Sequence, residues 1–162
     1  MAKNSENDLE IPETKYHRVI NLLSLILLIG TFVYLLIAWK HIPDKIPGHY
    51  NAAGEIDRWG GKYELFVCPV ISVLLYLFIT FLERYPELWN TGVEITAKNK
   101  VRIYSILKNM ITTLKFSTVF IFTSLTVYSA LARPLPGWFT PLYLFLFFGP
   151  MAYFLIQIYR KR

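Results

Sequence analysis

The chain has 162 residues, of which 54% are hydrophobic and 17% aromatic, and its mean hydropathy is +0.39. This composition is too apolar for an ordinary soluble domain of this size and favours a single membrane domain, residues 1–162. The formal net charge of +6 does not indicate a nucleic-acid partner. The excess of positive charge lies in one internal loop and at the carboxyl end, where charge bias and anionic lipids explain it in membrane proteins.

The chain begins with a polar, partly acidic segment, residues 1–18, which differs from the basic start of a secretory signal. We interpret it as a retained cytoplasmic tail. Residues 19–39 follow without a formal charge, and as a helix they would extend over about 30 Å, enough to cross the hydrocarbon core. Backbone groups cannot stay unpaired in hydrocarbon, so this span is expected to be helical.

Residues 40–64 form a loop of different composition, rich in Pro, Gly and charged residues. Pro43 and Pro47 stiffen its beginning, and the segment 51–54 (NAAG) predicts a tight turn in which Gly54 supplies a left-handed backbone position. Trp and Tyr residues at 39, 50, 59 and 63 are typical of a membrane–water interface. We therefore expect an ordered cap on the membrane surface.

The loop also holds a dense set of hydrogen-bonding and titratable side chains, namely His41, His49, Glu55, Asp57, Arg58 and Lys62. One interpretation is chemical: a metal site, an anion site, or proton transfer between His49 and Asp57. The other is structural, with these groups pairing to fix a lid, and the equal number of cations and anions in the loop favours it. The spacing matches no metal motif, so a metal ligand set stays unknown.

The second span is predicted at residues 65–82, and a cytoplasmic loop at 83–112 follows. Within that loop, apolar residues at helical spacing from Val101 indicate an amphipathic helix lying on the inner surface. Cys68 lies in the second span, and we interpret it as a buried small residue. With all spans helical, the expected fold is an all-α membrane protein.

The third and fourth spans are predicted at residues 113–132 and 138–159, joined by a short outer turn at 133–137. Lys115 would reach back from the third span to the headgroups through its long side chain. Thr113, Ser117 and Ser124 form a hydroxyl stripe that usually marks helix packing. A substrate path is the alternative for this stripe, although no charged residue is expected deep in a span.

Orientation follows from the distribution of Lys and Arg. Twelve of the 17 lie in the tail, in the second loop together with Lys115 at the start of the third span, and in the last residues, 160–162; five lie in the first and third loops. Positive residues concentrate on the cytoplasmic side, so the sequence predicts a multi-pass plasma-membrane protein with both termini inside and the 40–64 loop outside.

Two sets of residues resemble a bacterial membrane family known by a domain of unknown function, which is similar to the amino-terminal part of the sporulation-delaying toxin immunity protein. The first set, in the outer loop, is Ile42-Pro43-Asp44, Ile46-Pro47, His49-Tyr50-Asn51, Gly54-Glu55-Ile56-Asp57 and Trp59-Gly60 with Lys62. The second, in the inner loop, is Trp89-Asn90, Val93-Glu94-Ile95-Thr96, Asn99 and Tyr104.

The resemblance implies a multi-span protein, one branch of which protects its cell from a secreted membrane-active peptide. This chain ends after four spans, whereas that branch is longer. The residues that the resemblance marks as a ligand-binding or structural motif are His49, Asn51, Gly54, Glu55, Asp57, Trp59 and Lys62.

Three hypotheses for function follow. The leading one is a non-enzymatic protein without a cofactor, whose outer loop binds or blocks an external peptide or small ligand, as in toxin immunity. The second is a membrane-surface enzyme or metal-binding protein that uses His49, Glu55 and Asp57. The third is an accessory subunit of a transporter. The bilayer is the one partner that the composition itself indicates; the oligomeric state stays unknown.

Overall fold

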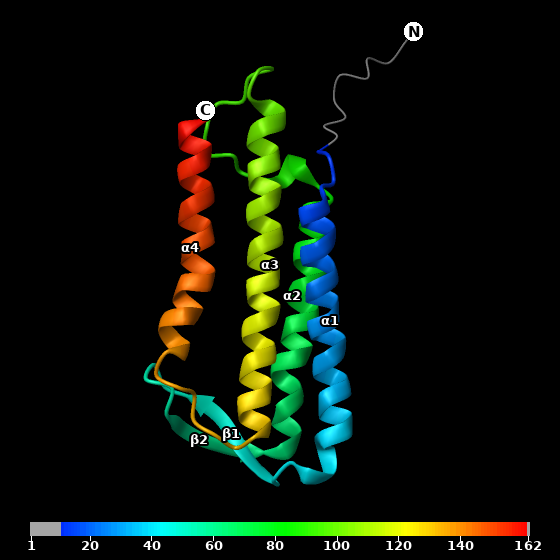
Figure 1. Cartoon of the computed structure of the whole chain (residues 1–162), viewed down its shortest axis with the longest axis vertical. Coiled ribbons are helices and arrows are strands. Elements are labelled where there is room, and N and C mark those ends of the chain that lie inside the picture. The colour runs from blue at the N-terminus through cyan, green and yellow to red at the C-terminus, as the bar shows by residue number, and fades with distance from the viewer. Residues whose placement is uncertain (1–10, 162) are drawn as a thin grey trace.

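The computed structural model describes residues 11–161, so residues 1–10 of the predicted tail and Arg162 lie outside the described part. Within it, four long helices form an elongated bundle (Figure 1). They are α1 (Lys15–Ala38), α2 (Val67–Glu83), α3 (Lys100–Ala130) and α4 (Phe139–Arg160). All four, with the short 3-10 turns that extend α1 and α2, are long and apolar enough to cross a membrane, as predicted.

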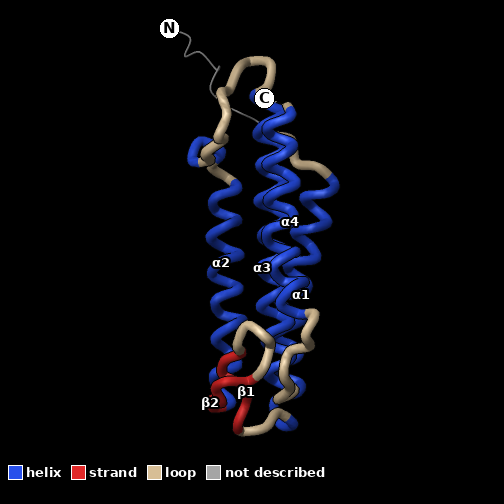
Figure 2. Tube along the Cα trace, turned by 90° about the vertical axis from the view of Figure 1, so that its left-hand side faces the viewer, coloured by secondary structure: helices blue, strands red, loops and turns tan. Residues whose placement is uncertain are grey.

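α3 is the central helix, because α1, α2 and α4 each pack against it. α4 packs mainly on α3. α1 and α3 run in the same direction. The start of α1 and the end of α4 lie at one end of the bundle, and the loop between α1 and α2 covers the other (Figures 1 and 2). We call these the terminal end and the hairpin end.

The loop folds into an antiparallel β-hairpin, β1 (Lys45–Tyr50) and β2 (Ile56–Gly61), which the sequence analysis did not predict as strands. Its turn has Gly54 in the left-handed conformation at φ 85°, with the Gly54 N–H donating to the carbonyl of Asn51 at 2.9 Å. A small apolar cluster lies between the hairpin and the helices and contains Leu35, Ile46 and Leu65. The hairpin is therefore anchored to the bundle.

The amphipathic helix expected on the inner surface is not a separate element. α3 is continuous from Lys100 to Ala130, and Ile103 and Leu107 in its first part are buried against Ile158 of α4. Its 31 residues extend over about 46 Å, against about 30 Å for a hydrocarbon core. The polar pattern that suggested a surface helix lies in the first part of this continuous helix.

The prediction that Lys115 reaches back to the headgroups is wrong. Its side chain is only 1% exposed and lies between α2 and α3. The ammonium group pairs with Glu83 and donates to the hydroxyl of Thr80 at 3.3 Å. Thr112 donates to the other carboxylate oxygen of Glu83 at 2.8 Å. These four residues, which we call the inner polar layer, provide a buried ion pair in a region where the sequence analysis expected none.

Polar contacts also connect α1 to α3. The Thr14 N–H donates to His17 Nδ1 at 3.1 Å, so the proton of this ring is on Nε2, which donates to Asn109 Oδ1 at 2.7 Å. In the predicted hydroxyl stripe, Thr113 bonds to Tyr16 of α1 at 2.6 Å and Ser117 is buried. These two positions serve helix packing.

Candidate functional site

A cavity of about 810 Å³ lies under the hairpin, between α2, α3 and α4. Strand β1 forms its roof from Ile46 to Tyr50, together with the turn residues Asn51 and Ala52. Large apolar side chains such as Leu75, Ile121 and Phe147 form its walls. The volume lies within the range of pockets that hold small molecules, so this is the main candidate site.

The cavity opens sideways between α2 and α4. Phe78 of α2 and Tyr143 of α4 both line it, yet they are 57% and 40% exposed. This opening exists because α4 packs mainly on α3 and leaves the facing side of α2 uncovered. In a bilayer, the opening would face lipid.

Arg58 and Glu64 provide the charge at the roof. Their side chains form an ion pair at 2.9 Å, and Arg58 also donates to the carbonyl of Gly48 at 2.7 Å. A Cβ at Gly48 would lie 2.9 Å from the guanidinium group, so glycine leaves room for this contact. The two opposite charges cancel, and the roof is polar but neutral.

Tyr50 attaches the hairpin to the turn between α3 and α4. Its hydroxyl donates to the carbonyl of Arg133 at 3.1 Å and lies 3.3 Å from the hydroxyl of Ser129. Burial raises the pKa of Tyr50 above its ordinary value, and the hydrogen bond with Ser129 offsets part of this rise. Nearby, the Leu135 N–H donates to the carbonyl of Gly54 at 2.8 Å. The roof is thus fixed to the bundle at two points.

Three of the predicted motif residues build the hairpin turn. Asn51 Oδ1 accepts hydrogen bonds from the N–H groups of Ala53 and Glu55, and Asn51 Nδ2 donates to the carboxylate of Glu55. Gly54 occupies the left-handed position and lies so close to Leu135 that a Cβ would be 3.0 Å from it. These residues shape the turn, and Asn51 also lines the cavity.

The other four motif residues lie along the strands and just after them. His49 Nδ1 is 2.7 Å from Asp57 Oδ1 in an exposed pair, and His49 also lines the cavity. The Lys62 ammonium donates to the carbonyl of Ile42 and lies 4.7 Å from the centre of the Trp39 ring. Trp59 is 53% exposed.

The structure brings His49 and Asp57 together but pairs Glu55 with Asn51. Within residues 11–161, no group of three or more His, Cys, Asp or Glu side chains could hold a metal ion. The enzyme or metal hypothesis therefore retains only the exposed His49–Asp57 pair.

Sequence reasoning named His49, Asn51 and Arg58, which line the cavity, but missed the other residues that form it. Cys68 lines it and is only partly buried, and Tyr50, Ser129 and Glu64 contribute to the roof and its attachment. The opposite charges of Arg58 and Glu64, which are close together in sequence, were the one available signal for the ion pair at the roof. Contacts such as that between Tyr50 and Arg133 join distant parts of the chain and leave no local pattern.

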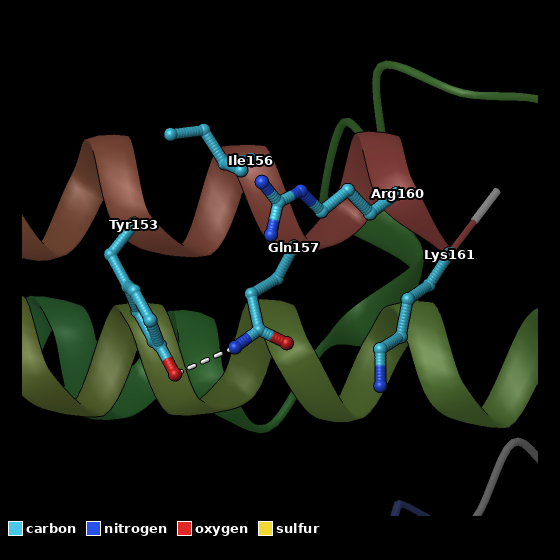
Figure 3. A pocket seen from close by; sticks show the side chains of 5 residues that line it. All are labelled: Tyr153, Ile156, Gln157, Arg160 and Lys161. Carbon is cyan, nitrogen blue, oxygen red and sulfur yellow. Dashed lines mark hydrogen bonds between the residues drawn. The ribbon is translucent and has the colours of Figure 1, made fainter.

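A second, smaller hollow of about 320 Å³ lies on α4 at the terminal end, and Figure 3 shows the side chains that line it. It is lined by Tyr153, Ile156, Gln157, Arg160 and Lys161, and Gln157 donates to the hydroxyl of Tyr153 at 2.6 Å. It has no roof comparable to the hairpin, and we regard the larger cavity as the candidate site.

Comparison with known proteins finds a family match in the hairpin region. Residues 26–73 match the domain of unknown function DUF1648. This stretch contains the second half of α1, the whole hairpin and the start of α2. The match therefore covers the roof of the cavity and the helices that carry it.

The chain is also similar to an uncharacterized protein of Archaeoglobus fulgidus, with 28% identity over 99 residues. The similarity covers 56% of this chain and 54% of the relative, so the chain spans about half of that protein's length. No solved structure matches the chain.

Proposed function

We propose that this protein is a multi-span plasma-membrane protein that binds an external ligand in the cavity beneath its hairpin. The observation that supports this proposal is the cavity itself, whose roof belongs to the only β-sheet within the described residues. A ligand there would contact a polar, neutral roof and apolar walls. The proposal requires no cofactor and no covalent chemistry.

The proposed orientation places the hairpin end outside the cell. Lys and Arg are concentrated in the segments at the terminal end, including the loop before α3, and positive residues favour the cytoplasmic side. With this orientation, the cavity opens in the outer half of the membrane. A molecule arriving from outside would meet the hairpin first.

The family-based version of the proposal is immunity to a secreted membrane-active peptide. Support comes from the outer-loop residues that resemble those of the immunity protein. An amphiphilic peptide has an apolar face for the cavity walls and polar groups for Asn51 and the Arg58–Glu64 pair at the roof. Occupying the cavity would hold such a peptide at the membrane surface and prevent deeper insertion.

A protection assay tests this version. Cells sensitive to the sporulation-delaying toxin are made to express the wild-type chain or one of two variants. Leu125→Trp adds a bulky side chain inside the cavity. Leu36→Trp is the control, because Leu36 lies on α1 and is 75% exposed. We expect wild type and Leu36→Trp to protect at equal membrane levels, and Leu125→Trp to lose protection. Absence of protection by wild type would refute immunity, and full protection by Leu125→Trp would exclude the cavity as the site.

A further inference from the structure

We infer that the cavity binds one long hydrocarbon chain of an outer-leaflet lipid whose polar end is uncharged or zwitterionic. This inference rests on the proposed function, because it assumes that the cavity is a ligand site and that the hairpin end faces outside. It names the chemical class of the ligand. Three properties of the cavity support it.

The first property is depth. Along α3, the lining residues extend from Ser129 beneath the hairpin to Thr118. Eleven residues of α-helix correspond to about 16 Å, and half of a hydrocarbon core is about 15 Å. The cavity therefore extends through one leaflet, the distance over which a lipid chain lies in its membrane.

The second property is the lateral opening. A pocket for a water-soluble molecule would open toward the aqueous phase, whereas here the hairpin covers that end and exposed Phe78 and Tyr143 border the side. The walls below the roof are mainly apolar, with Leu75, Ile121 and Phe147 contributed by three different helices. A chain could enter from the bilayer without leaving hydrocarbon.

The third property is the chemistry of the roof. Arg58 and Glu64 satisfy each other, so they offer hydrogen bonds and no net charge to a polar end group. The exposed rings of Trp59 and Trp138 lie in the hairpin and in the turn before α4, as expected of interface residues. Arg58 is the only Lys or Arg among the described residues that line the cavity, and it is already paired with Glu64, so a neutral or zwitterionic end is favoured over an anionic one.

The single cysteine provides a direct test, since Cys68 lines the cavity. The purified full chain, in a rigid steroid detergent that has no flexible chain, is treated with N-ethylmaleimide, and the rate of Cys68 modification is measured. Lysophosphatidylcholine with an 18-carbon chain at ten times its dissociation constant should slow the reaction about tenfold, because about one molecule in ten stays empty. A six-carbon analogue should leave the rate unchanged.

Two variants and one further lipid complete the design. Leu125→Trp should abolish the effect of the long chain, while the exposed control Leu36→Trp should retain it. Anionic lysophosphatidylglycerol of the same chain length should slow the reaction less than the zwitterionic lipid. Equal slowing by both would overturn the assignment of the polar end.

The outcomes separate this inference from the proposed function. If no lipid slows the reaction but the toxin peptide does, the cavity is a ligand site and the lipid inference is wrong. If neither slows it, and Leu125→Trp reacts at the wild-type rate, both the inference and the proposed function fail. If the long chain slows it while the cells gain no protection, the lipid inference stands and the immunity function is wrong.

Discussion

The buried pair of Lys115 and Glu83 leads to the most quantitative prediction. Their side chains are 1% and 10% exposed, so replacing either one leaves an uncompensated charge inside the bundle. We expect Lys115→Met and Glu83→Met each to lower the free energy of unfolding by about 3–5 kcal/mol. The double variant removes both charges and breaks one hydrogen bond each of Thr80 and Thr112. At about 1 kcal/mol for each lost hydrogen bond, it should lose about 2 kcal/mol, less than either single variant.

The assay is an SDS titration in mixed micelles, followed by tryptophan fluorescence. Lys108→Met is the matched control, because within residues 11–161 the Lys108 ammonium hydrogen-bonds to a backbone carbonyl, that of Ile11, at 3.4 Å and forms no ion pair. This control should cost less than about 1 kcal/mol. If Lys115→Met costs no more than Lys108→Met, or if the double variant costs the sum of the two single variants, the pair is not buried and coupled as described.

Three further predictions concern the hairpin. Gly54→Ala should lower the free energy of unfolding by about 1–3 kcal/mol, because the backbone at residue 54 is left-handed and the new Cβ would lie 3.0 Å from Leu135. The stability contributed by Tyr50 should be complete below pH 10.0 and decrease as pH rises above it. The reason is that burial raises the pKa of Tyr50 in the folded chain, so the unfolded chain loses this proton first. Tyr50→Phe should lack this decrease when the free energy of unfolding is measured between pH 9 and 11. A cysteine at Ala53, in a chain whose native cysteine is replaced by serine, should react with an impermeant thiol reagent in intact cells.

Each of these predictions has its own control. Gly92→Ala also places a side chain at positive φ, 66°, but no atom lies within 4 Å of its Cβ, so it should cost less than Gly54→Ala. A wild-type pH profile identical to that of Tyr50→Phe would show that the hydroxyl is not buried. A cysteine at Lys98 should react only after the cells are opened, and the reverse pattern would invert the proposed orientation.

The spans were predictable because a single physical requirement determines them. Uncharged runs long enough to cross hydrocarbon must form helices. α1, α2 and α4 begin and end within four residues of the predicted bounds, whereas α3 begins at Lys100, well before the predicted start at residue 113. The turn at Gly54 was also predictable, because Asn-Ala-Ala-Gly is a local signal in which glycine provides the left-handed position. Both kinds of information lie within a short stretch of chain.

The inner polar layer and the cavity were not predictable, because they depend on contacts between distant residues. At the start of a predicted span, Lys115 could either reach the headgroups or form a buried ion pair. Only its position opposite Glu83 in the structure distinguishes these two cases. Apolar positions on α2, α3 and α4 likewise do not reveal where two helices separate. The continuous α3 was missed because a helical pattern does not show whether its polar part lies on the membrane or extends beyond it.

The inner polar layer and the cavity both lie along α2 and α3, and this arrangement explains why the cavity is at the hairpin end. Toward the terminal end, the Lys115–Glu83 pair holds α2 against α3. One turn of α3 further on, Thr118 is the first α3 residue that lines the cavity. At the hairpin end, Tyr50 and Gly54 attach the roof to the turn that leads into α4, so the hairpin covers the space between the helices. Since α4 packs mainly on α3, the described chain leaves the side of this space uncovered, and in a membrane the nearest molecule that can fill it is a lipid.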